Sequence, residues 1–143
     1  MKISIINGAN LNQLGKREPE IYGKLSFEEY FEQLKKHCPN IEFTYRQSNI
    51  EGEIVNFIQQ AGETSDGIIL NAGGYSHTSV VIADAVKSIS KPCIEVHISN
   101  IFSREEVRHK SLISAYARGS IIGLGLAGYR LAAEWFNQLI INN

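Results

Sequence analysis

The chain has 143 residues, of which 43% are hydrophobic and 20% are charged, and its formal net charge is −1. This composition is typical of a soluble globular protein, and we expect a single domain over residues 1–143. The near-zero net charge argues against binding to nucleic acid or to an anionic membrane, and no apolar run reaches the ~20 residues of a membrane span.

The first predicted strand, Lys2–Asn7, precedes a long segment without periodicity. Connections in compact domains usually run about 4–6 residues, and longer ones are often lids or binding loops. This segment, Gly8–Leu25, carries Arg17 and Tyr22. A guanidinium beside a phenol would lower the phenol's pKa and make tyrosinate an accessible base, whereas without that contact Tyr22 is an exposed aromatic. Spacing alone leaves both interpretations open.

Two helices are predicted from capping boxes, in which a serine at the N-cap and a glutamate three residues later bond to each other's backbone. The pairs are Ser26 with Glu29 and Ser48 with Glu51. Between these helices, the β-branched and aromatic segment Ile41–Gln47 predicts the second strand.

The third predicted strand, Gly67–Asn71, is followed by a polar segment whose paired glycines would let a ligand approach the backbone closely. His77 lies in this segment and either binds a ligand or caps the next helix. That helix is predicted from about Thr78 to the break before Pro92. Asp84 lies well inside it, away from the strand ends, and its position alone indicates a surface carboxylate.

The fourth predicted strand, Cys93–His97, ends on a histidine, and strand alternation places Glu95 on the same face. A carboxylate that orients an imidazole and stabilises its cation is one way to build a general acid. The carboxyl end of a strand is also the expected place for an active site. We therefore favour a catalytic histidine over one that only satisfies hydrogen bonds at the sheet edge.

A third capping box, Ser103 with Glu106, predicts a capped and solvated helix start. An anionic substrate held near His97 would need a guanidinium clamp, and Arg104 and Arg108 are the nearest arginines in the sequence.

The fifth predicted strand, Gly119–Gly123, leads into a G-x-G-x-x-G sequence at Gly123–Gly128, and the last helix follows. The dinucleotide fingerprint with this pattern belongs to a first βαβ unit with an acidic residue about 20 positions on. Too few residues remain after Gly128 for that unit. The pattern instead predicts a tight turn between strand and helix.

Five strands that alternate with helices favour an α/β fold, a flavodoxin-like parallel sheet with helices on both faces. Cys38 and Cys93 are isolated, which indicates buried free thiols in a reducing compartment such as the cytoplasm. His77 and His97 have no third ligand at useful spacing, so a metal site is the weaker hypothesis.

Six ordered blocks of the sequence closely resemble type II 3-dehydroquinate dehydratase. They are Asn7–Asn12, Gly15–Gly23, Arg46–Glu53, Asn71–Ser79, Glu95–Asn100 and Arg104–His109. Together they span nearly the whole chain, which makes the resemblance far more specific than one short motif. It implies a cofactor-free dehydration of 3-dehydroquinate to 3-dehydroshikimate through an enolate, a step of aromatic biosynthesis.

The resemblance also implies roles for individual residues. Tyr22 would remove the C2 proton, Arg17 would stabilise its tyrosinate, and His97 would protonate the departing hydroxyl. Asn10 would hold a water against the enolate oxygen, and Glu95 would support His97. The residues expected to bind the substrate's carboxylate and hydroxyls are Asn71, His77, Ile98, Ser99 and Arg108.

The resemblance revises the interpretation of Asp84, because its counterpart in the family reaches the active site from a neighbouring subunit of a trimer. The expected partners are thus the substrate and further copies of this chain, in a homododecamer built as a tetramer of trimers. The chain departs from the common family pattern at Ala9, Gln13, Ile50 and Phe102-Ser103. None of these departures removes a predicted acid, base or clamp.

Two other interpretations compete. One is a flavodoxin-like binding module. A module that binds flavin mononucleotide would need a hydroxyl-rich phosphate loop after the first strand, but this loop offers asparagines and glycines. A phospho-acceptor receiver would need acidic residues at the strand ends, where this chain has Asn7 and Asn71. An inactive oligomeric scaffold is the second alternative, and the presence of Arg17, Tyr22 and His97 argues against it.

Overall fold

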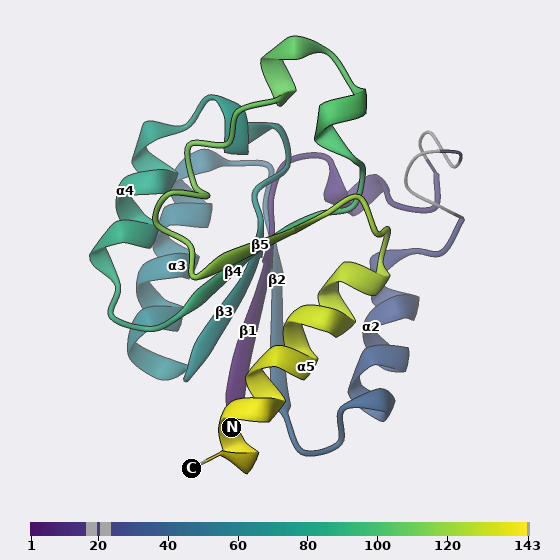
Figure 1. Ribbon diagram of the computed structural model, residues 1–143, viewed down its shortest axis with the longest axis vertical. Coiled ribbons are helices and arrows are strands. Elements are labelled where there is room, and N and C mark those ends of the chain that lie inside the picture. Colours follow the sequence, from purple (N-terminus) through teal and green to yellow (C-terminus); the bar gives the residue numbers. More distant parts are fainter. Residues whose placement is uncertain (17–19, 21–23, 143) are drawn as a thin grey trace.

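The computed structural model describes residues 1–16, 20 and 24–142, which form a five-stranded sheet between two layers of helices (Figure 1). The strands are β1 (Lys2–Asn7), β2 (Glu42–Gln47), β3 (Gly67–Asn71), β4 (Cys93–His97) and β5 (Gly119–Ile122). Their order is β2-β1-β3-β4-β5, and every neighbouring pair is parallel. The predicted flavodoxin-like α/β fold is confirmed, and each strand begins and ends within one residue of its prediction.

Four α-helices of the described residues cover the sheet. They are α2 (Phe27–His37), α3 (Glu51–Thr64), α4 (Val80–Ser88) and α5 (Ala127–Ile141). Figure 1 shows α3 and α4 on one face and α2 and α5 on the other. Short 3₁₀ helices follow three of the strands, namely η1 (Leu11–Gln13), η2 (Gly73–His77), η3 (Ile101–Ser103) and η4 (Glu106–Arg108). No helix among the described residues is both long and apolar enough to cross a membrane.

Alternating side chains of the strands feed two hydrophobic cores. On β1, Ile3 and Ile5 pack in the core that contains Phe27 of α2, whereas Ile6 packs in the core that contains Ile54 of α3. All five side chains are at most 1% exposed. Each such side chain contributes about 1.5–3 kcal/mol by burial. The central strands are therefore a rigid platform for the groups at their carboxyl ends.

The helix starts follow the predicted caps in part. At α2 the capping box is confirmed, because Glu29 N–H donates to Ser26 Oγ at 3.2 Å and Ser26 N–H donates to Glu29 Oε2 at 3.0 Å. Helix α4 begins two residues later than expected, because Ser79 is its N-cap and accepts from the Ile82 N–H at 3.1 Å. The 3₁₀ helix η2 ends at His77, and Thr78 separates it from this N-cap.

The second predicted capping box is wrong. Helix α3 does begin at Glu51, but Ile50 is its N-cap and supplies no side-chain hydrogen bond. The Ser48 hydroxyl instead donates to the Glu53 carboxylate and accepts from the Ile50 N–H at 2.9 Å. Ser48 therefore closes a turn before the helix, a local use of serine that competes with capping.

Candidate active site

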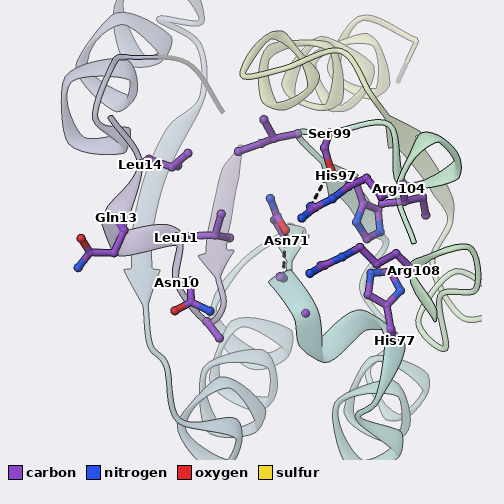
Figure 2. Close-up of a pocket in the computed structure, with 15 residues that line it drawn as sticks. Asn10, Leu11, Gln13, Leu14, Asn71, His77, His97, Ser99, Arg104 and Arg108 are labelled. Atoms are coloured by element: carbon purple, nitrogen blue, oxygen red, sulfur yellow. Dashed lines mark hydrogen bonds between the residues drawn. The ribbon is translucent and has the colours of Figure 1, made fainter. Parts of the chain in front are cut away.

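A cavity of about 120 Å³ opens at the carboxyl ends of β1, β3 and β4 (Figure 2). The predicted site residues that line it are Asn10, Asn71, His77, His97, Ile98, Ser99 and Arg108. Arg104, the second arginine considered as a clamp, also lines it. Gln13 and several small or apolar residues line it as well and were not predicted. Arg17 and Tyr22 lie outside the described residues, so their predicted roles remain predictions.

His97 and Glu95 form a buried pair at the end of β4. The His97 Nε2 lies 2.8 Å from Glu95 Oε1, and the two residues are 5% and 0% exposed. Three serine hydroxyls donate to the same carboxylate, Ser111 to Oε1, and Ser114 and Ser120 to Oε2. The carboxylate thus accepts four hydrogen bonds, two at each oxygen.

This set of donors fixes the ionisation of Glu95 and the tautomer of His97. Burial by itself raises the pKa of Glu95, but the hydrogen bonds and charge of His97 and the serine hydroxyls outweigh it and lower the pKa to about 2. An ionised carboxylate only accepts hydrogen bonds, so His97 must carry a hydrogen on Nε2. Nδ1 is therefore the nitrogen left to exchange a proton with a bound ligand.

We expect Glu95 to make the stability of the protein depend on pH under acidic conditions. Its pKa falls from an ordinary value of 4.5 to about 2 on folding, so its stabilisation is fully present above pH 4.5 and is lost as the pH falls through 2. A shift of this size corresponds to roughly 3 kcal/mol. The difference in unfolding free energy between wild type and Glu95→Gln should shrink by about that amount across this window.

Denaturant titrations at several pH values would measure this difference, with the exposed Glu63→Gln as the control that changes little. A difference between wild type and Glu95→Gln that stays constant down to pH 2 would show that the carboxylate is not held ionised as the structure indicates.

His77, at the end of η2, presents an acceptor to the cavity. Its ring stacks on His97 with 5.9 Å between centroids, and its Nδ1 lies 2.8 Å from the Lys110 carbonyl oxygen. Nδ1 must therefore donate, which leaves Nε2 as an acceptor while the ring is neutral. Burial, helped by the charges of His97 and Arg108, lowers the pKa of His77 and favours that neutral state. Ser79, and not His77, caps the helix that follows, so the alternative role of His77 as a cap is wrong.

The two arginines reach the cavity from a different local structure than predicted. No capped helix begins at Ser103; its hydroxyl donates to the Asn100 carbonyl at 2.8 Å and it ends η3. Glu106 begins the separate 3₁₀ helix η4, which has no side-chain cap. The predicted capping pair, Ser103 and Glu106, thus lies in two separate short turns. This arrangement places Arg104 and Arg108 beside the cavity.

Arg104 and Arg108 form a cationic wall. Figure 2 shows both side chains extending towards Asn71, opposite Asn10. Arg104 Nη1 donates to Ser99 Oγ at 3.3 Å, and Arg108 Nε donates to Glu105 Oε2 at 2.6 Å. Two guanidinium groups in one small cavity are suited to binding a carboxylate.

The opposite wall is the turn after β1, which belongs to the long segment Gly8–Leu25 that the sequence marked as a lid or binding loop. Asn10 has a φ of 68°, and it alone among the described non-glycine residues has a positive φ. Asparagine tolerates this left-handed conformation, and the side chain of Asn49, just after β2, holds its backbone. The Asn10 N–H donates to Asn49 Oδ1 at 2.9 Å, and Gln47 Nε2 donates to the same oxygen at 3.0 Å.

The paired glycines after β3 have separate functions. A Cβ atom on Gly73 would lie 2.7 Å from the Ala9 carbonyl oxygen, so this glycine lets the turns after β1 and β3 pack together. A Cβ on Gly74 would meet nothing within 4 Å, and Gly74 lines the cavity. Both glycines line the cavity, and Gly73 also allows the turns after β1 and β3 to approach each other.

Other singled-out residues lie away from the cavity. Asp84 is exposed on α4 and does not line the cavity of its own chain. Gly123 and Gly125 have positive φ values of 85° and 62° and form the predicted turn before α5. Within the described part of the chain, no three potential metal ligands gather in one place.

A buried histidine–carboxylate pair, two arginines and a small polar cavity at the carboxyl ends of parallel strands define an α/β enzyme for a small anionic substrate. The model of the family described as "Dehydroquinase class II" matches residues 1–137. The chain therefore belongs to the class II dehydroquinase family.

Similar proteins extend this result over the whole chain. The 3-dehydroquinate dehydratase of Fusobacterium nucleatum is 52% identical over 96% of this chain and 100% of that protein. The protein of the same name from Campylobacter jejuni is 54% identical over 97% of this chain and 89% of that one. The crystal structure of type II dehydroquinase from Butyrivibrio crossotus has a TM-score of 0.92, with 46% identity over 96% of this chain and 97% of that one.

Proposed function

We propose that this chain is a 3-dehydroquinate dehydratase, which eliminates water from 3-dehydroquinate to give 3-dehydroshikimate in the pathway to aromatic amino acids. The observation that carries the proposal is the buried His97–Glu95 pair beside two cavity arginines, in a chain of the class II dehydroquinase family. The relatives named 3-dehydroquinate dehydratase support the same reaction, because they match nearly the entire chain.

The first half of the proposed elimination breaks the C2–H bond of the substrate. The C3 carbonyl acidifies this hydrogen, and Tyr22 as tyrosinate takes the proton while the electron pair forms an enolate. Arg17 lowers the pKa of Tyr22 by charge stabilisation. Asn10, which lines the cavity, holds a water against the enolate oxygen.

The second half expels the C1 hydroxyl. The enolate re-forms the carbonyl, its electrons form the C1–C2 double bond, and the C1–O bond breaks. Hydroxide is a poor leaving group, so protonated His97 donates the proton on Nδ1 and water departs. Glu95 holds the opposite nitrogen and stabilises the cationic imidazole before transfer.

The rest of the cavity suits the remaining groups of the substrate. Arg108, with Arg104 beside it, and the Ile98-Ser99 backbone bind the carboxylate, while neutral His77 accepts from a hydroxyl and Asn71 donates to one. A Schiff-base route would need an amine, and no lysine lines the cavity in the described part of the chain. The residue set therefore favours the enolate route.

We further propose that the cytoplasmic enzyme is a homododecamer of four trimers, and that Asp84 completes the site of a neighbouring subunit. The exposure of Asp84 on α4 is consistent with this role. Light scattering at micromolar concentration would measure the assembly, and a monomer would contradict the role of Asp84.

The proposed reaction is tested by its product, a conjugated enone that absorbs in the ultraviolet. We expect absorbance to rise when purified protein is mixed with 3-dehydroquinate, and the rate to scale with protein concentration. No rise with ample folded protein would rule out the proposed function.

A further inference from the structure

Tyr129 joins the carboxyl ends of two strands beneath the cavity without lining it. It lies in the first turn of α5, and its side chain is 0% exposed. Its hydroxyl donates to Asn7 Oδ1, at the end of β1, at 2.8 Å. It also accepts from Asn71 Nδ2, at the end of β3, at 2.9 Å. Of these three residues, Asn71 alone lines the cavity.

The hydrogen bonds that link Gly73, Asn71, Tyr129 and Asn7 have directions that can be deduced, starting from the Gly73 backbone N–H. The Gly73 N–H can only donate, and it lies 3.1 Å from the Asn71 amide oxygen. The amide nitrogen of Asn71 must therefore face Tyr129, whose oxygen accepts. Burial raises the pKa of Tyr129, so the phenol keeps its hydrogen and donates it to Asn7. The orientation of the Asn71 amide, which is ambiguous for an isolated asparagine, is thus determined.

We propose that Tyr129 is a positioning residue that orients Asn71 as a hydrogen-bond donor to the substrate. The inference rests on the proposed function, in which Asn71 binds a substrate group. The Asn71 oxygen accepts from Gly73 and one of its N–H groups donates to Tyr129, which leaves the second N–H able to donate to a ligand. The substrate atom that it recognises must be an acceptor, such as a hydroxyl or carboxylate oxygen.

Tyr129→Phe removes the hydroxyl and keeps the ring, and Tyr30→Phe is a matched control. The Tyr30 ring lies in the same aromatic cluster, 6.2 Å from that of Tyr129, and its buried hydroxyl has no hydrogen-bond partner among the described residues. We expect Tyr129→Phe to raise KM about three- to tenfold and to leave kcat within about twofold of wild type. This is the effect expected when one hydrogen bond that acts on substrate binding is lost. Tyr30→Phe should leave both constants unchanged.

A double-mutant cycle separates positioning from a structural effect. If Tyr129 acts through Asn71, Tyr129→Phe should raise KM no further when Asn71 is already alanine. An unchanged KM in Tyr129→Phe, or an increase that multiplies with that of Asn71→Ala, would overturn the inference. If Tyr129→Phe does not fold, Asn7→Ala removes the acceptor of the same hydroxyl and is expected to give the same pattern.

Crystal structures of the two tyrosine variants give a readout that does not depend on turnover. We expect a displaced or rotated Asn71 amide in Tyr129→Phe and an unchanged one in Tyr30→Phe. An Asn71 that keeps its position without the Tyr129 hydroxyl would overturn the inference. An inactive wild-type protein would instead count against the proposed function, and the structures would still decide the role of Tyr129.

Discussion

Replacement of His97 by asparagine is expected to lower kcat by about 10²–10⁴-fold, the usual contribution of a general acid. Asparagine keeps an N–H donor near Glu95 but has no group that delivers a proton to a leaving hydroxyl. KM should change much less, because the arginine wall and Asn71 are untouched. Steady-state rates from the ultraviolet assay measure both constants.

The control for this variant is His37→Asn. His37 lies on α2, outside the cavity, and is half-exposed beside Glu134. It should retain wild-type kcat. Thermal melting should accompany both variants, because a weakened donor to the buried Glu95 carboxylate is expected to cost about 1–3 kcal/mol. A folded His97→Asn protein with a kcat near that of wild type would mean that another group is the acid.

Replacement of Tyr22 by phenylalanine is expected to have an effect of similar size on kcat, about 10²–10⁴-fold, because no phenolate remains to remove the C2 proton. Binding of 3-dehydroquinate should persist, since the ring is retained and the residues that bind the carboxylate and hydroxyls are unchanged. Calorimetric titration of the inactive variant with substrate would measure that binding directly.

Tyr116→Phe is the matched control, because Tyr116 is 45% exposed and does not line the cavity. It should behave as wild type. Near-normal turnover in Tyr22→Phe would identify a different base, whereas loss of both turnover and binding would indicate that Tyr22 mainly holds the substrate.

The inner strands β1, β3 and β4 were predictable because each is a short segment, rich in β-branched residues, at the centre of a parallel sheet. Both faces of such a strand are covered by helices, so its sequence reads as an apolar run, as in Gly67–Asn71. Helix starts were less predictable. Ser26 and Ser48 begin the same Ser-x-x-Glu pattern, yet only Ser26 caps a helix, because a nearby Glu53 captures the Ser48 hydroxyl.

The site was predictable where it depends on topology. Asn71 and His97 end parallel strands, and such ends meet at one edge of the sheet, so their shared cavity followed from the fold class. The contact between Glu95 and His97 followed from strand alternation.

Other parts of the site depend on tertiary packing. The serine donors to Glu95 come from a loop and from β5, and Arg104 reaches the cavity only because two 3₁₀ turns replace a helix. Tyr129 meets Asn7 and Asn71 across more than fifty positions of sequence. No local pattern encodes such contacts.

The central claim is that side chains of this chain perform the elimination through an enolate, and one rate measurement tests it most directly. Dehydration of 3-dehydroquinate is followed by ultraviolet absorbance after dialysis against a chelator, and separately after treatment with borohydride in the presence of substrate. We predict the full rate of untreated enzyme in both cases. Loss of activity that added metal restores, or irreversible inactivation by borohydride through a trapped Schiff base, would contradict the claim.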